Sequence, residues 1–304
     1  MRKIALIYNP KAGNKRFHYL LDYTLATFQK EGYEIHVYRT SGPQDFADLI
    51  TRNDSQEYAA ILIAGGDGSV SLAVNALLKE KRDIPIGIIP AGTANDFAYH
   101  LGMPRDLKQA IKSLINMEIR PADVGLVNNQ VFINVCSGGV LTDISQKIDL
   151  KRKNTLGKLA YYLKGVQELP HFNSMKLRVS ADNIDIIEDF LIFVVLNGPS
   201  AGGLTKLGGN ASVFDGVLDF VGFKAVSLTQ LPLVFSKILL GEHLNDKRVI
   251  HFRTSSLRIE NLESPISILD SDVDGEKGPD YPLNISVLPG RLKIICPFLN
   301  NRGK

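Results

Sequence analysis

The stretch Ile61-Leu62-Ile63-Ala64-Gly65-Gly66-Asp67-Gly68-Ser69 joins an apolar run to a glycine cluster that contains one carboxylate. Every position of the run is apolar, without polar alternation, which predicts a strand buried on both faces of a parallel sheet. Residues 69–78 then carry apolar side chains at helical spacing. The glycines therefore fall at a strand-to-helix turn, where backbone N–H groups at a helix start can face an anion. This geometry is typical of a phosphate site.

The first third of the chain alternates short apolar runs with amphipathic segments. This alternation favours an α/β domain with a doubly wound, mostly parallel, Rossmann-like sheet. Because open α/β sheets bind ligands at the carboxyl ends of their strands, we expect the turns there to converge on one crevice. The predicted strands are 4–8, 33–38, 59–64 and 84–89, and the predicted helices are 19–28, 46–50, 69–78 and 106–116.

After about Pro121 the pattern changes to many strands and few helices, which predicts an antiparallel, sandwich-like domain. We therefore expect an α/β nucleotide-binding domain over 1–122, a β-rich acceptor domain over 123–295, and a return of 296–304 to the first domain. Asn128-Asn129 is a hairpin signal between 124–127 and 131–135. Further strands are expected at 176–180, 184–196, 217–223, 249–259, 283–287 and 292–295, and helical insertions at 154–168 and 228–240.

Composition narrows the class of protein. The 304 residues suffice for two domains, and 44% hydrophobic and 22% charged residues are ordinary for a globular chain. A net charge of +3 is too small to imply nucleic acid as a partner. Cys136 and Cys296 lie in apolar surroundings and are predicted to be reduced core thiols.

The sequence also bears on metals and membranes. No histidine pair has the spacing of a transition-metal site, so none is expected. No apolar run approaches the roughly 20 residues of a spanning helix. We therefore expect a cytoplasmic protein with transient, peripheral membrane association.

The second glycine motif is Pro90-Ala91-Gly92-Thr93-Ala94-Asn95-Asp96-Phe97-Ala98. Gly92 lets the backbone approach a ligand, Thr93 offers a hydroxyl, and Asn95 and Asp96 can orient a substrate or a neighbouring loop. Both glycine motifs also have a purely structural interpretation, because Asp, Asn and Ser suit helix N-caps. A Rossmann fingerprint fits poorly, since Ser71 stands where its third glycine belongs, and no Walker A sequence exists.

Taken together, the two glycine motifs resemble the catalytic domain of the diacylglycerol kinase and related lipid kinase family, especially its bacterial soluble members. Asn9-Pro10-Lys11-Ala12-Gly13 opens the chain as in that family. Asp215-Gly216-Val217-Leu218-Asp219 and Asp274-Gly275-Glu276 follow in the family's order, so the likeness covers nearly the whole chain. Ser69 departs from the commoner threonine but keeps the hydroxyl.

The resemblance implies the fold of NAD kinases and phosphofructokinases, with an active site between a nucleotide domain and a β-rich domain. It implies ATP as co-substrate, with phosphates held by loop amides and charge added by Lys11 or Lys15. The implied nucleotide contacts are Asn9, Pro10, Lys11, Ala12, Gly13, Thr40, Gly65, Gly66, Asp67, Gly68, Ser69, Val70, Ser71 and Thr93.

The resemblance also assigns catalytic roles near the end of the chain. Glu276 would act as the base on the lipid hydroxyl, and Asp274 would share magnesium or that hydroxyl. This fits phosphoryl transfer, in which the protein positions the acceptor, neutralises charge and takes a proton. Without the resemblance, the carboxylates of 270–276 would indicate a solvated surface loop.

By the same analogy, Asp215 and the backbone oxygens of Ser212 and Val217 would hold Mg²⁺, which prefers oxygen ligands. An Asp-Gly turn before the strand at 218–223 is the alternative.

The segment 147–164 is the most basic of the chain and contains one apolar helical face. It suits an anionic membrane surface, or else a helix packed on its own sheet with a solvated basic flank. Edge strands in the second domain are compatible with a homodimer.

The sequence as a whole predicts an ATP-dependent lipid kinase that phosphorylates diacylglycerol or a related lipid, giving phosphatidic acid or an analogue. Two alternatives stay open. One is a kinase for a soluble acceptor such as NAD or a sugar phosphate, and the other is a non-catalytic nucleotide-binding regulator.

Overall fold

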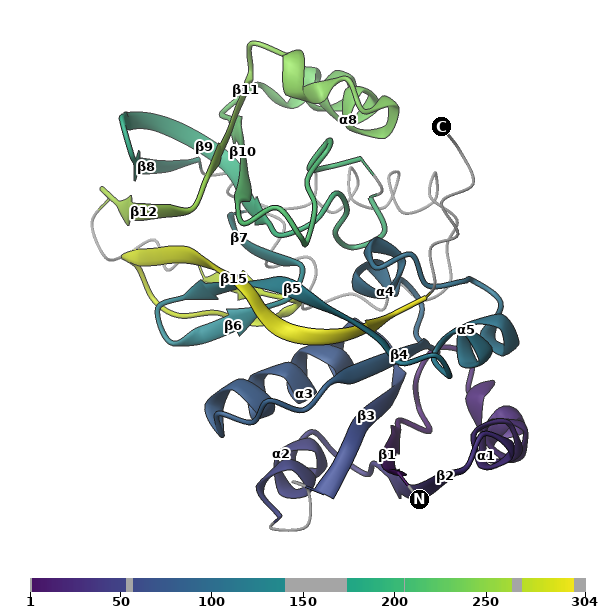
Figure 1. Cartoon of the computed structure of the whole chain (residues 1–304). Helices are drawn as coiled ribbons and strands as arrows, with labels where there is room; N and C mark the ends of the chain where they lie inside the picture. Colours follow the sequence, from purple (N-terminus) through teal and green to yellow (C-terminus); the bar gives the residue numbers. More distant parts are fainter. Residues whose placement is uncertain (1, 53–56, 140–173, 205, 264–269, 298–304) are drawn as a thin grey trace. The chain divides into compact units, whose positions relative to one another are not determined.

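The computed structural model describes residues 2–52, 57–139, 174–204, 206–263 and 270–297 (Figure 1). The chain divides into two units: unit 1 comprises Met1–Asp123 and Pro289–Lys304, and unit 2 comprises Val124–Leu288. Residues 289–295, which sequence analysis assigned to the second domain, fall in unit 1, because Ile294 and Ile295 pair with Ile86 and Gly87. The helix expected at 154–168 and the basic segment 147–164 lie outside the described residues.

Unit 1 is built on a parallel sheet, as predicted, in the order β2-β1-β3-β4-β15. Its inner strands β1, β3 and β4 are largely buried because helices cover both faces, and seven of the eight residues of β3 are buried. The edge strand β2 is mostly half-buried or exposed. Helix α2 packs beside α3, and α1 beside α5 (Figure 1). The strands are β1 (Arg2–Tyr8), β2 (Tyr33–Arg39), β3 (Tyr58–Gly65), β4 (Ile86–Pro90) and the end of β15 (Leu283–Cys296). The helices are η1 (Phe17–Leu20), α1 (Leu21–Lys30), α2 (Gln44–Thr51), α3 (Asp67–Lys79), α4 (Asp96–His100) and α5 (Leu107–Ser113).

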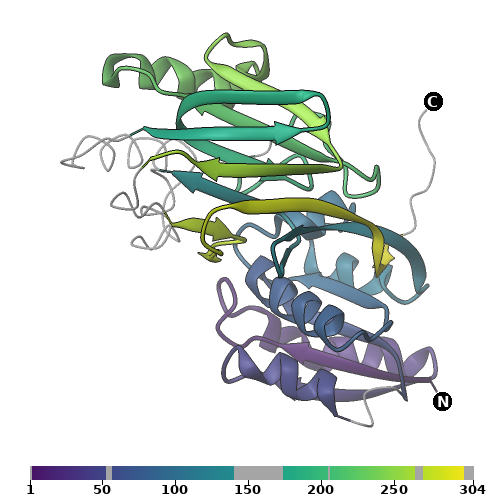
Figure 2. The same ribbon diagram turned by 90° about the vertical axis from the view of Figure 1, so that its left-hand side faces the viewer.

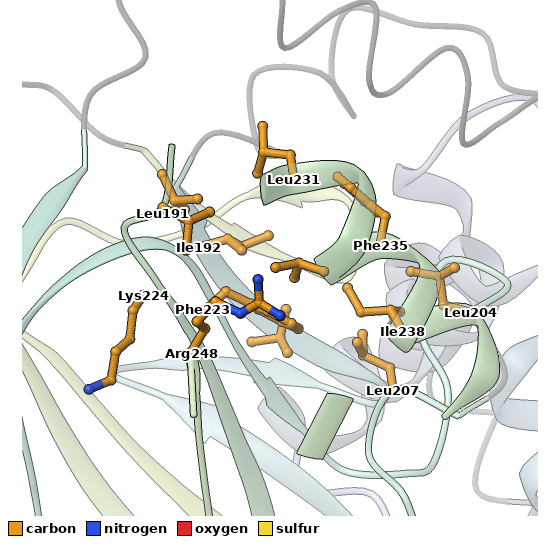
Figure 3. Close-up of a pocket in the computed structure, with 13 residues that line it drawn as sticks. Leu191, Ile192, Leu204, Leu207, Phe223, Lys224, Leu231, Phe235, Ile238 and Arg248 are labelled. Atoms are coloured by element: carbon orange, nitrogen blue, oxygen red, sulfur yellow. The ribbon is translucent and has the colours of Figure 1, made fainter. Parts of the chain in front are cut away.

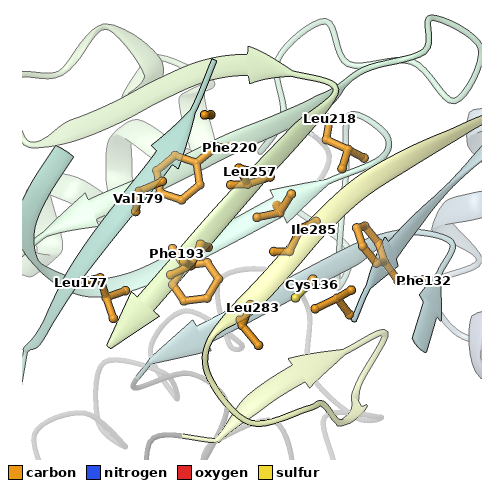
Figure 4. Close-up of a cluster of buried hydrophobic side chains, with 14 of the residues drawn as sticks. Phe132, Cys136, Leu177, Val179, Phe193, Leu218, Phe220, Leu257, Leu283 and Ile285 are labelled. Carbon is orange, nitrogen blue, oxygen red and sulfur yellow. The ribbon is translucent and has the colours of Figure 1, made fainter. Parts of the chain in front are cut away.

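Unit 2 is antiparallel, as predicted, and its strands run side by side in Figure 2. The order is β14-β13-β7-β9-β8-β12-β15, and β10 joins β9 to β11. A core of phenylalanine and aliphatic side chains, Phe193 and Phe220 among them, packs between these strands (Figure 4). The strands are the end of β5 (Glu118–Val127), β6 (Gln130–Phe132), β7 (Val135–Gly139), β8 (Met175–Ala181), β9 (Ile184–Leu196), β10 (Leu218–Lys224), β11 (Val249–Thr254), β12 (Ser256–Asn261), β13 (Ser271–Val273), β14 (Glu276–Lys277) and the start of β15. The helices are η4 (Leu228–Gln230), α8 (Leu231–Leu240) and η5 (His243–Asn245).

Three predicted strand boundaries were wrong. The expected strand 249–259 breaks at Ser255, because β11 pairs with β10 whereas β12 pairs with β8 and β15. The expected strand 131–135 breaks at residues 133–134, whose amides are bound by a distant carboxylate described below. Conversely, 283–287 and 292–295 belong to the single strand β15.

Two smaller predictions were confirmed. Residues 127 and 130 pair across the Asn128-Asn129 turn, as expected for a hairpin. Cys136 and Cys296 are both buried and form no disulfide. Burial raises the pKa of the Cys296 thiol to about 11, so the thiol form dominates at neutral pH.

Candidate functional site

The turns that follow the strands of unit 1 lie together at the carboxyl edge of the sheet. The Asn9 amide donates to the Ala64 carbonyl oxygen at 3.0 Å, and the Thr40 amide donates to the Tyr8 carbonyl oxygen at 3.0 Å. The Gly92 amide donates to the carbonyl oxygen at the end of β3 at 3.1 Å. The predicted convergence of these turns is therefore present in the structure.

Close backbone contacts between these turns require glycine. A Cβ on Gly92 would lie 2.3 Å from the Gly66 Cα, and a Cβ on Gly13 would lie 2.5 Å from the Ala91 carbonyl oxygen. At Gly68, by contrast, a Cβ would meet no atom within 4 Å. The glycines thus let three loops touch while Gly68 faces open space.

The open space adjoins the first turn of α3. Gly66 is the N-cap, and its carbonyl oxygen accepts from the Ser69 and Val70 amides at 2.9 and 3.1 Å. The first N–H groups of a helix lack carbonyl partners within it and carry the positive end of the helix dipole. The start of α3 therefore provides the chemistry for holding a phosphate.

Two polar side chains of the glycine motifs are used to shape the loops. Asp67 accepts a hydrogen bond from the Phe97 amide at 3.0 Å and so ties α3 to the start of α4. Asn95 has a left-handed backbone (φ 55°), and its Oδ1 accepts from the Gly92 amide at 2.8 Å. Both side chains thus fix the geometry of the predicted nucleotide loop.

The other predicted nucleotide residues differ in exposure. The Lys11 amide donates to Asn9 Oδ1 at 2.9 Å, which closes a tight turn and leaves the lysine side chain exposed. Asn9 also donates through Nδ2 to the buried Ser69 hydroxyl at 3.3 Å. Thr93 is exposed, whereas Thr40, Val70 and Asp96 are buried. Pro10, Ala12 and Ser71 are half-buried.

Sequence analysis did not select His100, which lies one turn after Asp96 on α4. Burial lowers the pKa of His100 to about 4, and the negative charge of Asp67 opposes this shift. The imidazole is therefore neutral near neutral pH. No local pattern distinguishes this histidine, because its burial is set by long-range packing.

In unit 2, the segment that sequence analysis described as a polar loop is the β13–β14 hairpin. Its turn residues, Asp274 and Gly275, both have positive φ (52° and 92°), which Asp-Gly turns favour. Glu276 follows the turn, pairs with Val273 and is exposed. Within the described residues its carboxylate makes no hydrogen bond or ion pair, so it is available to a ligand.

Asp274 has a different environment from Glu276. Its carboxylate accepts from the Ile133, Asn134 and Val135 amides at 2.8, 2.9 and 3.0 Å. The buried Asn197, at the end of β9, binds the same corner by donating Nδ2 to the Ile133 carbonyl oxygen at 2.9 Å. Asp274 therefore anchors the hairpin that carries Glu276. The sequence analysis missed Asn197. The one local feature that could have indicated it is its position as a polar side chain directly after the apolar run of β9.

The residues predicted to hold Mg²⁺ lie before β10. Asp215 Oδ1 accepts from the Val217 amide at 3.3 Å, and Oδ2 forms an ion pair with Arg253. A carboxylate and backbone carbonyl oxygens are suitable donors for magnesium. The Arg253 guanidinium already neutralises this carboxylate, however. A bound cation therefore has to share the carboxylate with Arg253 or displace the guanidinium. No group of three or more His, Cys, Asp or Glu side chains suited to a metal occurs in the described ranges.

An apolar cavity lies in unit 2 between α8 and the strands β9 and β10 (Figure 3). Its volume is about 80 Å³. Lys224 and Arg248 are the charged residues among the described lining. Much of the remaining lining is aliphatic and aromatic, including Leu191, Ile192, Phe223, Leu231, Phe235 and Ile238.

No helix in the described part of the chain is both long and apolar enough to cross a bilayer.

Comparison with known proteins agrees with this architecture. Residues 3–127 match the family model of the diacylglycerol kinase catalytic domain, and residues 134–296 match the YegS C-terminal NAD kinase beta sandwich-like domain. The diacylglycerol kinase of Bacillus subtilis is 33% identical over 98% of this chain and 97% of its own length. That of Staphylococcus aureus strain MRSA252 is 32% identical over 98% and 93%.

Solved structures give the same result. The structure of a diacylglycerol kinase from Bacillus anthracis strain Sterne has a TM-score of 0.72 and 25% identity over 97% of both chains. A second structure from that strain has a TM-score of 0.79 and 27% identity over 97% of this chain and 95% of its own.

The matched family models and relatives define a kinase family of the two-domain type that joins an α/β domain to a β-rich domain. The chain belongs to the diacylglycerol kinase family. This membership supports a lipid kinase.

Proposed function

We propose that this protein transfers the γ-phosphate of ATP to the free hydroxyl of diacylglycerol or a closely related lipid, giving phosphatidic acid or an analogous phospholipid. The observation that carries the proposal is the open start of α3 at Gly68, where three glycine-dependent loops meet in a chain of this family. Backbone amides of these loops would hold the phosphates, with Lys11 adding positive charge.

Glu276 would accept the proton of the acceptor hydroxyl. The oxygen of that hydroxyl would form a bond to the γ-phosphorus while the bond between the γ-phosphorus and ADP breaks. The exposed carboxylate suits this role because it has no competing partner in the described residues. Asp274 would position Glu276 through its three amide contacts. Asn95, Asp96 and Asp67 would hold the loop next to the phosphates.

Asp215 and the carbonyl oxygens of Ser212 and Val217 would hold Mg²⁺. When bound, the ion supplies positive charge that offsets the negative charge of the phosphate oxygens in the bound nucleotide and in the transition state.

The apolar cavity favours a lipid acceptor over a soluble one. NAD and sugar phosphates carry charge and hydroxyl groups that an almost wholly apolar wall cannot satisfy. An apolar wall matches the environment that an acyl chain has in a bilayer, whereas leaving the chain in water would cost roughly 0.8 kcal/mol for each CH₂. We therefore place an acyl chain of the acceptor beneath α8.

A panel assay tests the proposal. The protein is given ATP labelled in its γ-phosphate together with diacylglycerol, phosphatidylglycerol, NAD or a sugar phosphate. Labelled phosphatidic acid is the expected product. Label in a soluble product, or nucleotide binding without transfer to any acceptor, would contradict the proposal and favour one of its two alternatives.

A further inference from the structure

Helix α8 is apolar around nearly its whole circumference. Of its ten residues, only Ser236 and Lys237 are polar. Leu231, Val234 and Ile238 are buried toward the cavity, whereas Leu233 and Leu240 are 52% and 61% exposed. Leu233 and Leu240 are seven residues apart, which places them two turns apart on one face of the helix. The outer face therefore exposes apolar surface that is not covered by the described part of the chain.

Two exposed lysines lie near the C-terminal end of α8. The Lys206 side chain packs over Gly241, and its Nζ lies 3.5 Å from the Leu240 carbonyl oxygen. Lys247 is exposed a few residues after the helix. Lys224 is paired with Glu188, and Lys237 and Arg248 are paired with the buried Asp246. Glu242 is exposed directly after the helix, so the described cations near α8 that remain for a partner are Lys206 and Lys247.

We propose that the outer face of α8, formed by Leu233 and Leu240 and flanked by Lys206 and Lys247, docks on an anionic lipid bilayer. Apolar side chains next to cations are what an interfacial helix needs to insert below phosphate headgroups. This inference rests on the proposed lipid acceptor, since diacylglycerol resides in bilayers. It adds the surface through which the enzyme reaches that acceptor.

A second copy of the chain fits this face less well. Stable interfaces bury about 800 Å² per partner, far more than two leucine side chains present. A two-fold symmetric contact would also bring the flanking lysines of both copies together.

Docking through α8 would also explain where the cavity lies. Leu231, Phe235 and Ile238 line the cavity from α8 (Figure 3). Leu233 and Leu240 are exposed, and helical spacing places them on the opposite face of α8. A bilayer in contact with the outer face would therefore be separated from the cavity by one helix. This short path suits a lipid whose acyl chain leaves the membrane as its headgroup is phosphorylated.

The chain contains no tryptophan, so a single introduced indole reports on its own surroundings. We would compare Leu240→Trp and Leu233→Trp with Ile187→Trp, a matched control that is 56% exposed on β9 in the same unit. With phosphatidylcholine vesicles containing phosphatidylglycerol, the two α8 reporters should shift to shorter wavelength and be quenched by brominated lipid. The effect should weaken with salt, and the control should stay unchanged.

Other results would overturn the inference. An equal response of Ile187→Trp, or none from the α8 reporters, excludes α8 as the docking face. A blue shift that depends on protein concentration without vesicles assigns the face to a second copy instead.

A second experiment separates this inference from the proposed function. The double variant Leu233→Ser/Leu240→Ser should lose at least tenfold in vesicle affinity, while it keeps its activity on a short-chain, water-dispersed diacylglycerol. Ile187→Ser should change neither. If the wild type binds vesicles through α8 but phosphorylates no lipid, the docking face is supported and the proposed function is contradicted. Full activity on vesicles in the double variant would remove the docking face alone.

Discussion

Asp274 and Val135 hydrogen-bond reciprocally: the Val135 amide donates to Asp274 Oδ1, and the Asp274 amide donates to the Val135 carbonyl oxygen, both at 3.0 Å. The same carboxylate binds two further amides of this corner. A carboxylate that is satisfied in this way is a structural anchor, and it leaves Glu276 as the available acidic group of the hairpin.

Asp274→Asn should therefore destabilise the protein by about 1–3 kcal/mol, because an amide NH₂ cannot accept the N–H donors that the carboxylate accepts. It should also lower kcat by displacing Glu276. Urea unfolding and steady-state kinetics measure the two effects. Asp270→Asn, which loses only an ion pair with the exposed Lys277, is the control and should change stability by less than about 1 kcal/mol. Unchanged stability of Asp274→Asn would contradict the anchoring role.

Glu276→Gln should behave in the opposite way. The side chain is exposed and without partners among the described residues, so the free energy of unfolding should change by less than about 0.5 kcal/mol. Loss of the base should reduce kcat by a factor on the order of 10² to 10⁴, while nucleotide affinity is retained. Calorimetric titration with a non-hydrolysable ATP analogue checks the affinity. A variant with near-normal turnover would show that another group takes the proton.

Gly92→Ala tests the contact between the two glycine loops. The new Cβ would lie 2.3 Å from the Gly66 Cα and 2.7 Å from Asn95 Oδ1, so the loops have to separate. Overpacking of this kind costs typically about 1–3 kcal/mol, and we expect KM for ATP to rise. The control is Gly42→Ala, where a Cβ would meet no atom within 4 Å. Equal kinetics for both variants would argue against a nucleotide role for this loop.

The ion pair between Asp215 and Arg253 predicts competition with magnesium. Arg253→Gln should increase the rise in melting temperature that Mg²⁺ produces, because the carboxylate is then freed for the ion. Asp215→Asn should abolish that rise. Thermal unfolding with and without EDTA measures it, and Ca²⁺ serves as the comparison ion. If Asp215→Asn responds to Mg²⁺ as the wild type does, the ion binds elsewhere.

Acid should destabilise the protein through His100. Burial sets its folded pKa at about 4, below the unfolded value of about 6.5. Between these values the unfolded state binds the proton and the folded state does not, so stability falls as pH drops from 6.5 to 4. The loss should reach about 2–3 kcal/mol. Unfolding curves of wild type and His100→Gln across this range isolate the contribution, because other groups cancel in the difference. Parallel curves would refute it.

Much of unit 1 could be predicted from local pattern. Apolar runs such as 61–64 specify strands because a parallel strand buried on both faces has no polar positions. The glycines after them specify turns, and the carboxyl ends of neighbouring parallel strands necessarily share an edge. The convergence of Asn9, Thr40, Gly66 and Gly92 followed from these rules alone.

Unit 2 was predicted less completely, since antiparallel pairing joins segments that are far apart in the chain. The chain switches partners at Ser255, and nothing in 249–259 marks that residue, because both halves have strand character. The polar residues at 270–276 looked like a loop because two short strands with few apolar residues give almost no periodic signal.

The sequence by itself determined the parallel α/β domain, the glycine turns, the antiparallel class of the second domain and the family. Only the tertiary structure decided the roles of individual carboxylates. Asp274 accepts a hydrogen bond from the Val135 amide, which lies 139 positions earlier, and Asp215 pairs with an arginine 38 positions later. It also decided which leucines of α8 line a cavity and which remain exposed. The physical reason is that backbone conformation follows from local sterics and periodicity, whereas the partner of a charge or an apolar face is set by long-range packing.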